Sequence, residues 1–197
     1  MQILEWDETR NLPSKSYVCG YCGCALASEK GWGASLPETG NSKYRAFIYI
    51  CHQCTRPTFV DEDGEVLPGT LFGDVVKYIP DDLVEKLYEE ARKCTGAGSY
   101  TAAILCCRKL LMHIAVSKGA KEGQNFLTYV EYLSNNHFVP PDAKDWLDHI
   151  RKKGNEANHE ISIMGREDAE ELLTFVGMLL KVIFEFPSTV KKKMATL

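Results

Sequence analysis

Two pairs of cysteines lie in the first third of the chain, and each pair has two residues between its members. The pairs are Cys19 with Cys22 and Cys51 with Cys54. This spacing lets both thiolates of a pair reach one ion from a tight turn, and two such turns complete the tetrahedral coordination of structural zinc. Because four thiolates leave no open position on the metal, the pairs predict a structural Zn²⁺ ion rather than a catalytic one.

Two further donors and two further chemistries fit the same segment. Cys24 beside Cys22, or His52 beside Cys51, could replace a ligand. An iron–sulfur cluster or a redox-active dithiol would use the same thiolates. The other three cysteines lie in helical patterns without a further donor and are interpreted as packing residues. These are Cys94, Cys106 and Cys107.

Eight cysteines are many for a chain of 197 residues. Their clustering, and an N-terminus without the apolar stretch of a signal peptide, favour metal binding in a reducing, cytoplasmic compartment. No apolar run approaches the roughly 20 residues that span a bilayer, so we expect no membrane contact. The formal net charge of −4 argues against non-specific binding of nucleic acid through overall charge, although a local basic surface stays open.

The pattern of the chain changes at residue 80, within a composition that is typical of a globular protein. We predict an α+β fold, with a small β-rich zinc ribbon over residues 1–79 and a five-helix bundle over residues 80–197. In the ribbon we expect strands at 17–18, 46–50 and 58–60, a hairpin turn at 61–66 and an irregular loop at 29–43. In the bundle we expect helices over 80–96, 99–118, 125–135, from 140 onward, and over 167–186, with Pro187 ending the last.

Arg108 lies in the predicted helix 99–118, which is apolar over most of its circumference and is therefore expected at the centre of the bundle. Apolar side chains flank Arg108 on both sides of the helix. A charged residue that faces an interior or an interface needs a partner. A structural ion pair and a functional, ligand-binding arginine both fit this position.

The predicted helix from residue 140 places Arg151, Asn155 and His159 on one polar ridge, because they are spaced four residues apart. An arginine can hold a phosphate, a histidine can transfer a proton near neutral pH, and an amide can orient either group. These groups suffice for cleavage of RNA through its 2′-hydroxyl, so the ridge is a candidate catalytic site. Hydrogen bonds from the ridge to helix ends and loops are the structural alternative.

Several features together resemble a bacterial and phage family of unknown function that joins an N-terminal zinc ribbon to a HEPN-like helical domain. The resemblance rests on the two cysteine pairs, on residues 54–59, 100–103 with Arg108, 150–159, and 167–169. It implies a small helical bundle that forms a homodimer. Many HEPN domains are metal-independent ribonucleases of toxin–antitoxin, CRISPR-associated and other phage-defence systems, with one active site at the dimer interface.

Two functions follow from these residues and this resemblance. The first is a zinc-containing, HEPN-like interaction module, dimeric, that binds protein or nucleic acid in a defence, counter-defence or stress-related context. The alternative is a metal-independent endoribonuclease in which His159 is the general acid and base, Arg151 clamps the phosphate and Asn155 orients either group. Arg108 is a further candidate binding residue.

Overall fold

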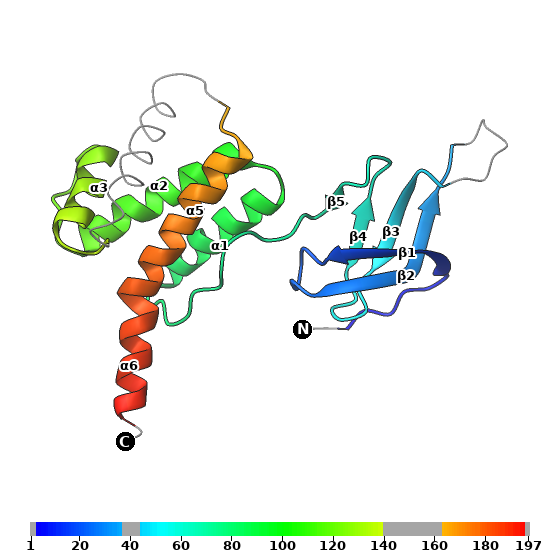
Figure 1. The fold of residues 1–197 in the computed structure, drawn as a ribbon, viewed down its shortest axis with the longest axis horizontal. Helices are drawn as coiled ribbons and strands as arrows, with labels where there is room; N and C mark the ends of the chain where they lie inside the picture. Colours follow the sequence, from blue (N-terminus) through cyan, green and yellow to red (C-terminus); the bar gives the residue numbers. More distant parts are fainter. Residues whose placement is uncertain (1–2, 37–43, 140–162, 196–197) are drawn as a thin grey trace. The chain divides into compact units, whose positions relative to one another are not determined.

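The computed structural model describes residues 3–36, 44–139 and 163–195, and it has the predicted α+β architecture (Figure 1). The chain divides into two compact units, Met1–Leu71 and Phe72–Leu197. The first is a β-sheet and the second is a set of helices. Each unit has a hydrophobic core of its own. They are therefore described one after the other.

The first unit is an antiparallel meander whose strands follow each other in chain order. Its strands are β1 (Arg10–Val18), β2 (Ala25–Ala34), β3 (Ala46–Ile50), β4 (Pro57–Val60) and β5 (Val66–Leu67). Side chains alternate between the two faces of a strand. One face packs into a small core around Leu26, Tyr49 and Val60. The other face is exposed.

The prediction of an irregular loop over the glycine-rich segment 29–43 is wrong for the first part of that segment, because β2 continues to Ala34. Gly31 pairs with Tyr49 on β3, and a Cβ atom at Gly31 would lie 1.7 Å from the carbonyl oxygen of Ile48. A Cβ at Gly33 would lie 2.4 Å from the ring of Tyr44. Glycine inside a strand often marks such a close approach, so these glycines permit the strand rather than interrupt it.

The hairpin turn predicted at 61–66 is confirmed. It joins β4 to β5, in which Phe59 pairs with Leu67. The Asp61 carboxylate accepts hydrogen bonds from the backbone N–H groups of Asp63 (3.0 Å) and Glu65 (2.7 Å). Gly64 takes a positive φ of 86° within the turn. Aspartate and glycine supply both requirements of a tight turn, which is why the sequence indicated it.

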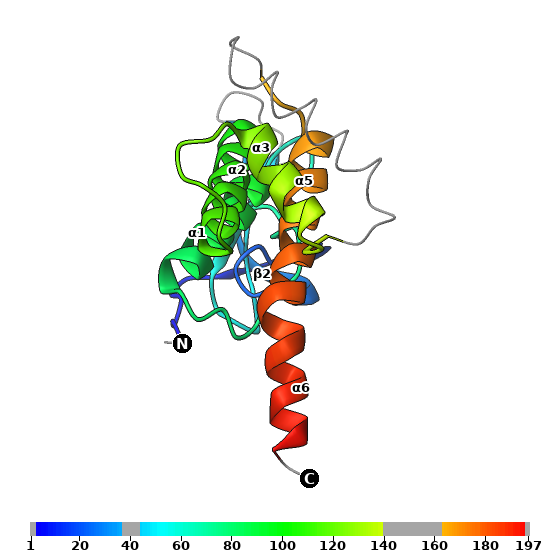
Figure 2. The ribbon, with the colours of Figure 1, turned by 90° about the vertical axis from the view of Figure 1, so that its left-hand side faces the viewer.

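The second unit contains four helical rods within its described residues, and α2 contacts each of the other three (Figures 1 and 2). Asp81 and Asn125 cap α1 and α3 by accepting from the N–H groups of Leu83 (2.8 Å) and Thr128 (2.9 Å). Ser99 precedes α2 without a side-chain capping hydrogen bond. The helices are α1 (Asp82–Gly96), α2 (Tyr100–Ser117), α3 (Phe126–Asn135) and α5 (Arg166–Leu180), which continues through the π-helix η2 (Lys181–Glu185) into α6 (Phe186–Met194). The helix predicted from residue 140 lies outside the described residues.

The last rod does not end at Pro187, contrary to the prediction. It continues through η2 into α6, where Pro187 occupies the first turn. Proline lacks the N–H group that an α-helix interior needs, but the first turn of a helical segment tolerates it, and a π-turn already interrupts the regular ladder. In Figure 2 α6 therefore extends beyond the ends of the other described helices. Lys191, Lys192 and Lys193 lie exposed on α6.

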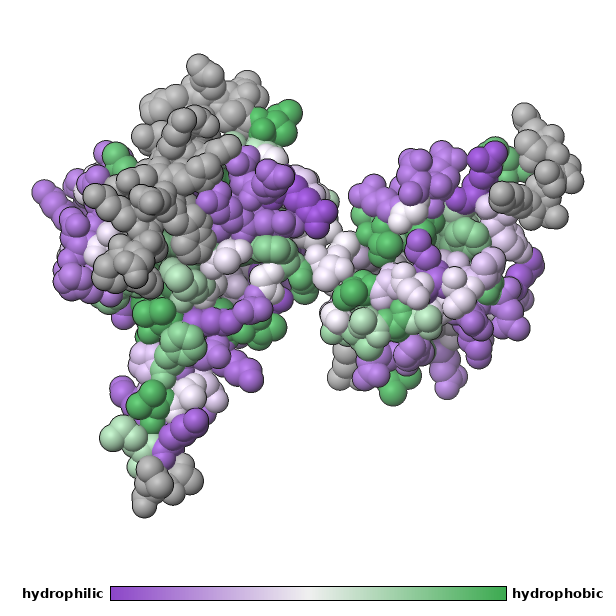
Figure 3. All heavy atoms as spheres, in the orientation of Figure 1, coloured by the Kyte–Doolittle hydropathy of each residue, from purple (hydrophilic) through white to green (hydrophobic). Residues whose placement is uncertain are grey.

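Two described helical segments are long and apolar enough, by length and composition alone, to cross a membrane: Tyr100–Ser117 and Arg166–Met194. The core helix of a globular protein meets the same criteria. Leu110, Leu111 and Ile114 of α2 are almost fully buried against neighbouring helices, which accounts for the apolar character of that segment. In Figure 3 hydrophobic and polar residues are mixed along the surface of α6.

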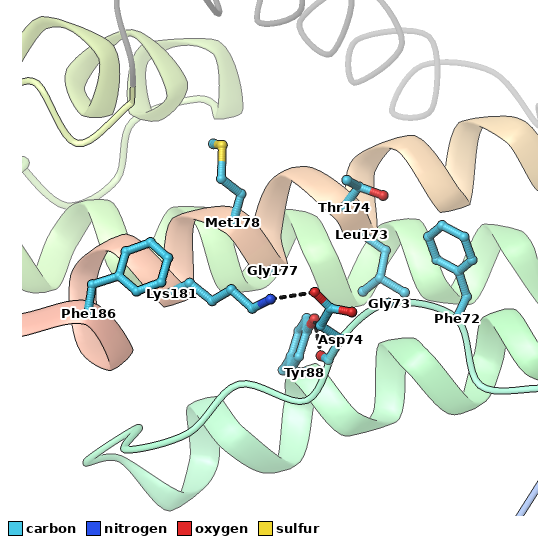
Figure 4. Close-up of a pocket in the computed structure, with 10 residues that line it drawn as sticks. All are labelled: Phe72, Gly73, Asp74, Tyr88, Leu173, Thr174, Gly177, Met178, Lys181 and Phe186. Atoms are coloured by element: carbon cyan, nitrogen blue, oxygen red, sulfur yellow. Dashed lines mark hydrogen bonds and ion pairs between the residues drawn. The ribbon is translucent and has the colours of Figure 1, made fainter. Parts of the chain in front are cut away.

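The helical unit begins at Phe72, earlier than the predicted boundary after residue 79. The segment 72–79 packs on the helices, and a cavity of about 470 Å³ lies where it meets α1 and α5 (Figure 4). The Tyr88 hydroxyl donates to the Asp74 carbonyl (2.9 Å), and Lys181 forms an ion pair with the Asp74 carboxylate. The hydrogen bond and charge of Lys181 lower the pKa of Asp74. These polar groups at the cavity are thus paired within the protein.

We expect Gly177→Ala to lower the free energy of unfolding by about 1 kcal/mol or more, because overpacking outweighs the gain in helix propensity. The added Cβ would lie 2.7 Å from the Tyr88 hydroxyl oxygen but 3.6 Å from the nearest ring carbon. In a Tyr88→Phe background the same substitution should instead be stabilising. Urea unfolding of the four variants measures this coupling. An equal effect of Gly177→Ala in both backgrounds would contradict the proposed clash.

Candidate functional site

The strand order brings the two predicted cysteine pairs to one end of the sheet. Cys19 and Cys22 lie in the turn between β1 and β2, and Cys51 and Cys54 lie in the turn between β3 and β4. In an antiparallel meander the first and third turns lie at the same end, because each strand reverses the direction of the chain. Cysteines that are far apart in the sequence therefore become neighbours.

The two cysteine turns have the same backbone hydrogen-bond pattern. In the first, the Gly23 N–H donates to the Cys19 carbonyl (2.8 Å), and in the second, the Thr55 N–H donates to the Cys51 carbonyl (2.8 Å). Gly23 and Thr55 occupy equivalent positions and both have positive φ angles, 70° and 54°. The sequence shows the glycine, but a threonine gives no signal for this conformation.

The four sulfur atoms form one cluster in which all lie within 4.8 Å of one another. Cys19 Sγ is 3.7 Å from Cys54 Sγ, and Cys22 Sγ is 3.8 Å from Cys51 Sγ. A tetrahedral ion with Zn–S bonds of about 2.3 Å places its sulfurs about 3.8 Å apart, whereas a disulfide needs about 2.05 Å. The cluster therefore fits one tetrahedral metal ion.

The two spare donors lie outside this cluster of described residues. The Cys24 thiol donates to the carbonyl of Ala25 (3.6 Å), and the side chain of His52 is exposed. Neither belongs to the group of donors that could hold one ion. The four donors that the structure brings together are thus the cysteines predicted from the spacing.

The electrostatics of the cluster favour a bound cation. Burial raises the pKa of Cys54 to about 12. At Cys51 burial opposes ionisation, but N–H donors of Cys54 and Gln53 and the neighbouring thiols outweigh it, so the pKa is lowered. Several thiolates so close together repel one another, and a divalent cation removes that repulsion and keeps coordinating thiols deprotonated.

A model of the family described as Domain of unknown function (DUF4145) matches residues 89–196, which is more than half of the chain. The chain belongs to the DUF4145 family. The match starts within α1, includes all of α2, α3, α5 and α6, and does not include the four clustered cysteines. Neither a search of curated proteins nor a search of solved structures gave a match. The metal cluster is therefore a feature that this chain carries ahead of its DUF4145 domain.

Arg108 lies on α2 inside the DUF4145 domain and is 5% exposed. Its guanidinium carbon lies 4.4 Å from the centroid of the Phe126 ring. Desolvation by burial lowers the pKa of Arg108. Its Nη1 atom has no hydrogen-bond partner among the described residues. No carboxylate pairs with it among the residues that the structure describes, so the predicted ion pair is not found there.

The candidate catalytic residues Arg151, Asn155 and His159 lie outside the described residues. The ribonuclease hypothesis stays a prediction from the sequence.

The helical cysteines pack in the core of the DUF4145 domain: Cys94, Cys106 and Cys107. Desolvation by burial raises the pKa values of all three thiols.

We expect the purified protein to hold one equivalent of Zn²⁺, and Cys54→Ser to lose it and unfold the sheet unit. Structural zinc contributes of the order of 10 kcal/mol to the folding of small modules. Mass spectrometry of the metal and hydrogen exchange in residues 10–34 measure the two effects. The matched variant Cys24→Ser should keep both metal and protection. Full zinc occupancy in Cys54→Ser would refute the assigned ligand set, as would loss of zinc in Cys24→Ser.

Proposed function

We propose that this protein is a zinc-stabilised interaction module in which the sheet unit binds a protein partner and a HEPN-like helical domain forms a homodimer. The observation that carries the proposal is a row of exposed apolar side chains across the sheet. The metal cluster supports a scaffolding role, because four thiolates fill the coordination sphere of zinc. No substrate position is left on the metal.

The row consists of residues that are directly opposite one another on successive strands. Trp32 pairs with Ile48, Ile48 pairs with Phe59, and Phe59 pairs with Leu67. Residues that are directly opposite lie on the same face of the sheet. Three of them are exposed by more than a third: Ile48 by 37%, Phe59 by 40% and Leu67 by 39%. We call these four residues the apolar row.

A contiguous apolar surface of this kind is typical of a site that binds another protein. Trp6 extends it, since its ring lies edge-on to Trp32 with centroids 5.7 Å apart. The Trp6 indole N–H donates to the Thr55 carbonyl (2.6 Å), which links this end of the row to the second cysteine turn. Zinc would therefore stabilise the surface as well as the unit.

The charge of the sheet unit favours a protein over a nucleic acid as the partner. Residues 1–71 contain nine acidic and six basic residues, a formal net charge of −3. The acidic turn 61–65 directly follows the strand that carries Phe59. Phosphate backbones would be repelled by this balance, because affinity for nucleic acid depends on lysine and arginine contacts. The guanidinium carbon of Arg56 lies 5.0 Å from the centroid of the Tyr21 ring.

The combined substitution Ile48→Thr and Phe59→Thr should remove the protein partner, because it removes apolar area and keeps a residue type that favours strands. Quantitative mass spectrometry of co-purified proteins from the native cell would compare it with the wild type. The control Lys30→Thr introduces a threonine at an exposed strand position outside the row without removing an apolar side chain. With the purified partner we expect the affinity of the double variant to be about tenfold or more below that of the wild type. Equal binding of the partner by the wild type, the double variant and the control would refute the proposal. Co-purification of RNA in place of a protein partner would also refute it.

The proposed homodimer is supported by an exposed apolar stripe on α6. Phe186, Val190 and Met194 are spaced four residues apart and are 55%, 55% and 72% exposed. Side chains with this spacing lie on one face of a helix. If two α6 helices cross antiparallel at Val190, Met194 of each copy lies beside Phe186 of the other. Sulfur–aromatic contacts of this type are favourable.

The wild type should sediment at about twice the chain mass of 22.1 kDa, and Val190→Glu should sediment as a monomer. Burying a carboxylate at the centre of an apolar interface is costly because it loses its hydration. Lys191→Gln changes the net charge by the same amount at an exposed position of α6 that lies to the side of the stripe, and this variant should stay dimeric. A monomeric wild type, or a dimeric Val190→Glu, would exclude this interface.

The resemblance to zinc-ribbon proteins with HEPN-like domains supports a role in defence, counter-defence or stress. The eight cysteines are all free of disulfides. Free thiols and a thiolate metal site fit a reducing compartment, so the proposed location is the cytoplasm.

A further inference from the structure

A second cavity of the helical unit is lined by α2 and by the start of α3, and it has a volume of about 640 Å³. This volume is within the range of about 300–1,000 Å³ that is usual for small-molecule sites. Arg108, Lys109 and His113 line it from α2, and Gln124 and Phe126 line it from the start of α3.

The state of its buried cation distinguishes this cavity from the one in Figure 4. There, Lys181 is paired with the carboxylate of Asp74. Here, Arg108 is 5% exposed, and within the described part of the chain its Nη1 atom has no hydrogen-bond partner. The Phe126 ring covers one face of the guanidinium. It does not satisfy the N–H groups, because these point outward in the plane of the guanidinium. A buried donor without a partner costs about 1–3 kcal/mol, and more when it is charged.

The other groups at the cavity are arranged to attract negative charge. Lys109 and His113 are exposed and follow Arg108 on α2. The N-terminus of α3, at Asn125 and Phe126, carries the positive end of the helix dipole. Of the described acids, Glu122 lines the cavity, and the carboxylate of Asp81 lies 3.6 Å from His113 Nε2. The acids are at the outside, and the buried charge is the arginine.

The apolar part of the lining favours a ligand with an apolar or planar body. Leu105, Met112, Val116, Phe126 and Tyr129 complete the cavity wall. An arginine presents two parallel N–H donors that match the oxygens of a phosphoryl group, and a neighbouring lysine favours a dianion over a single carboxylate.

We propose that this cavity binds a phosphorylated small molecule of about mononucleotide size. Arg108 receives the phosphoryl oxygens, Lys109 approaches them from the rim, and the apolar wall around Phe126 packs against the body of the ligand. The site is separate from the apolar row and from α6, so it does not depend on the proposed interactions.

Isothermal calorimetry and thermal unfolding with AMP, phenyl phosphate, adenosine and benzoate, at constant ionic strength, test this proposal with the full chain. We expect at least one phosphate ester to bind and to raise the melting temperature, and adenosine and benzoate to bind at least tenfold more weakly. Ligand-induced stabilisation follows from mass action on the folded state. If neither phosphate ester binds the wild type, or if benzoate binds as tightly, the proposal is wrong.

Variants of the two cations locate the binding. Arg108→Gln should weaken the phosphate ester at least tenfold, and the exposed Lys109→Gln should weaken it about threefold without affecting the core. Lys86→Gln, on the exposed surface of α1, is the matched control and should bind as the wild type does. If Arg108→Gln does not fold, the Lys109→Gln result decides. Unchanged affinity in Lys109→Gln would then overturn the assignment, as would unchanged affinity in a folded Arg108→Gln.

Discussion

The structure of the sheet unit depends on the convergence of four thiols at one end of an antiparallel meander. Three of these cysteines, Cys19, Cys51 and Cys54, are themselves members of the small hydrophobic core. Apart from these cysteines, the core contains few large side chains, such as Tyr17, Tyr49 and Val60. A module of this size buries little apolar surface, and a metal ion held by the four thiols would supply the free energy that such small cores lack. The exposed apolar row requires the same scaffold, because its members lie side by side only while the register of β2 to β5 is held.

The helical unit is organised around α2, whose two kinds of interior residue have different consequences. Leucine and isoleucine side chains fill the core, and they account for the apolar character of the helix. Arg108 is also buried, but its Nη1 atom has no hydrogen-bond partner among the residues that the structure describes. Proteins rarely leave a buried charged donor unpaired, because the lost hydration is not replaced. In the cavity between segment 72–79, α1 and α5, Asp74 pairs with both Tyr88 and Lys181. These two cavities therefore differ in whether the described residues complete their own polar contacts.

Local signals predicted the elements wherever local chemistry decides them. Asp81 and Asn125 cap the helices that follow them, and Asp61 with Gly64 forms the expected hairpin turn. The two large errors occurred where a distant contact overrides the local preference. Gly31 lies in a strand because it pairs with β3, and Pro187 is tolerated because the rod changes its hydrogen-bond pattern at η2.

The sequence by itself determined which four cysteines form the candidate metal site, since two residues between cysteines suffice to turn both thiols of a pair toward one point. It also determined the α+β division of the chain, because hydrophobic periodicity is a local property. Only the tertiary structure decided that Ile48 and Phe59 lie on one exposed face and that Arg108 lies above Phe126 beside a cavity. These relations join strands and helices whose separation along the chain says nothing of their register or packing. The sequence could therefore name Arg108 as a buried cation, but the absence of a partner among the described residues is visible only once α2 and α3 are packed together.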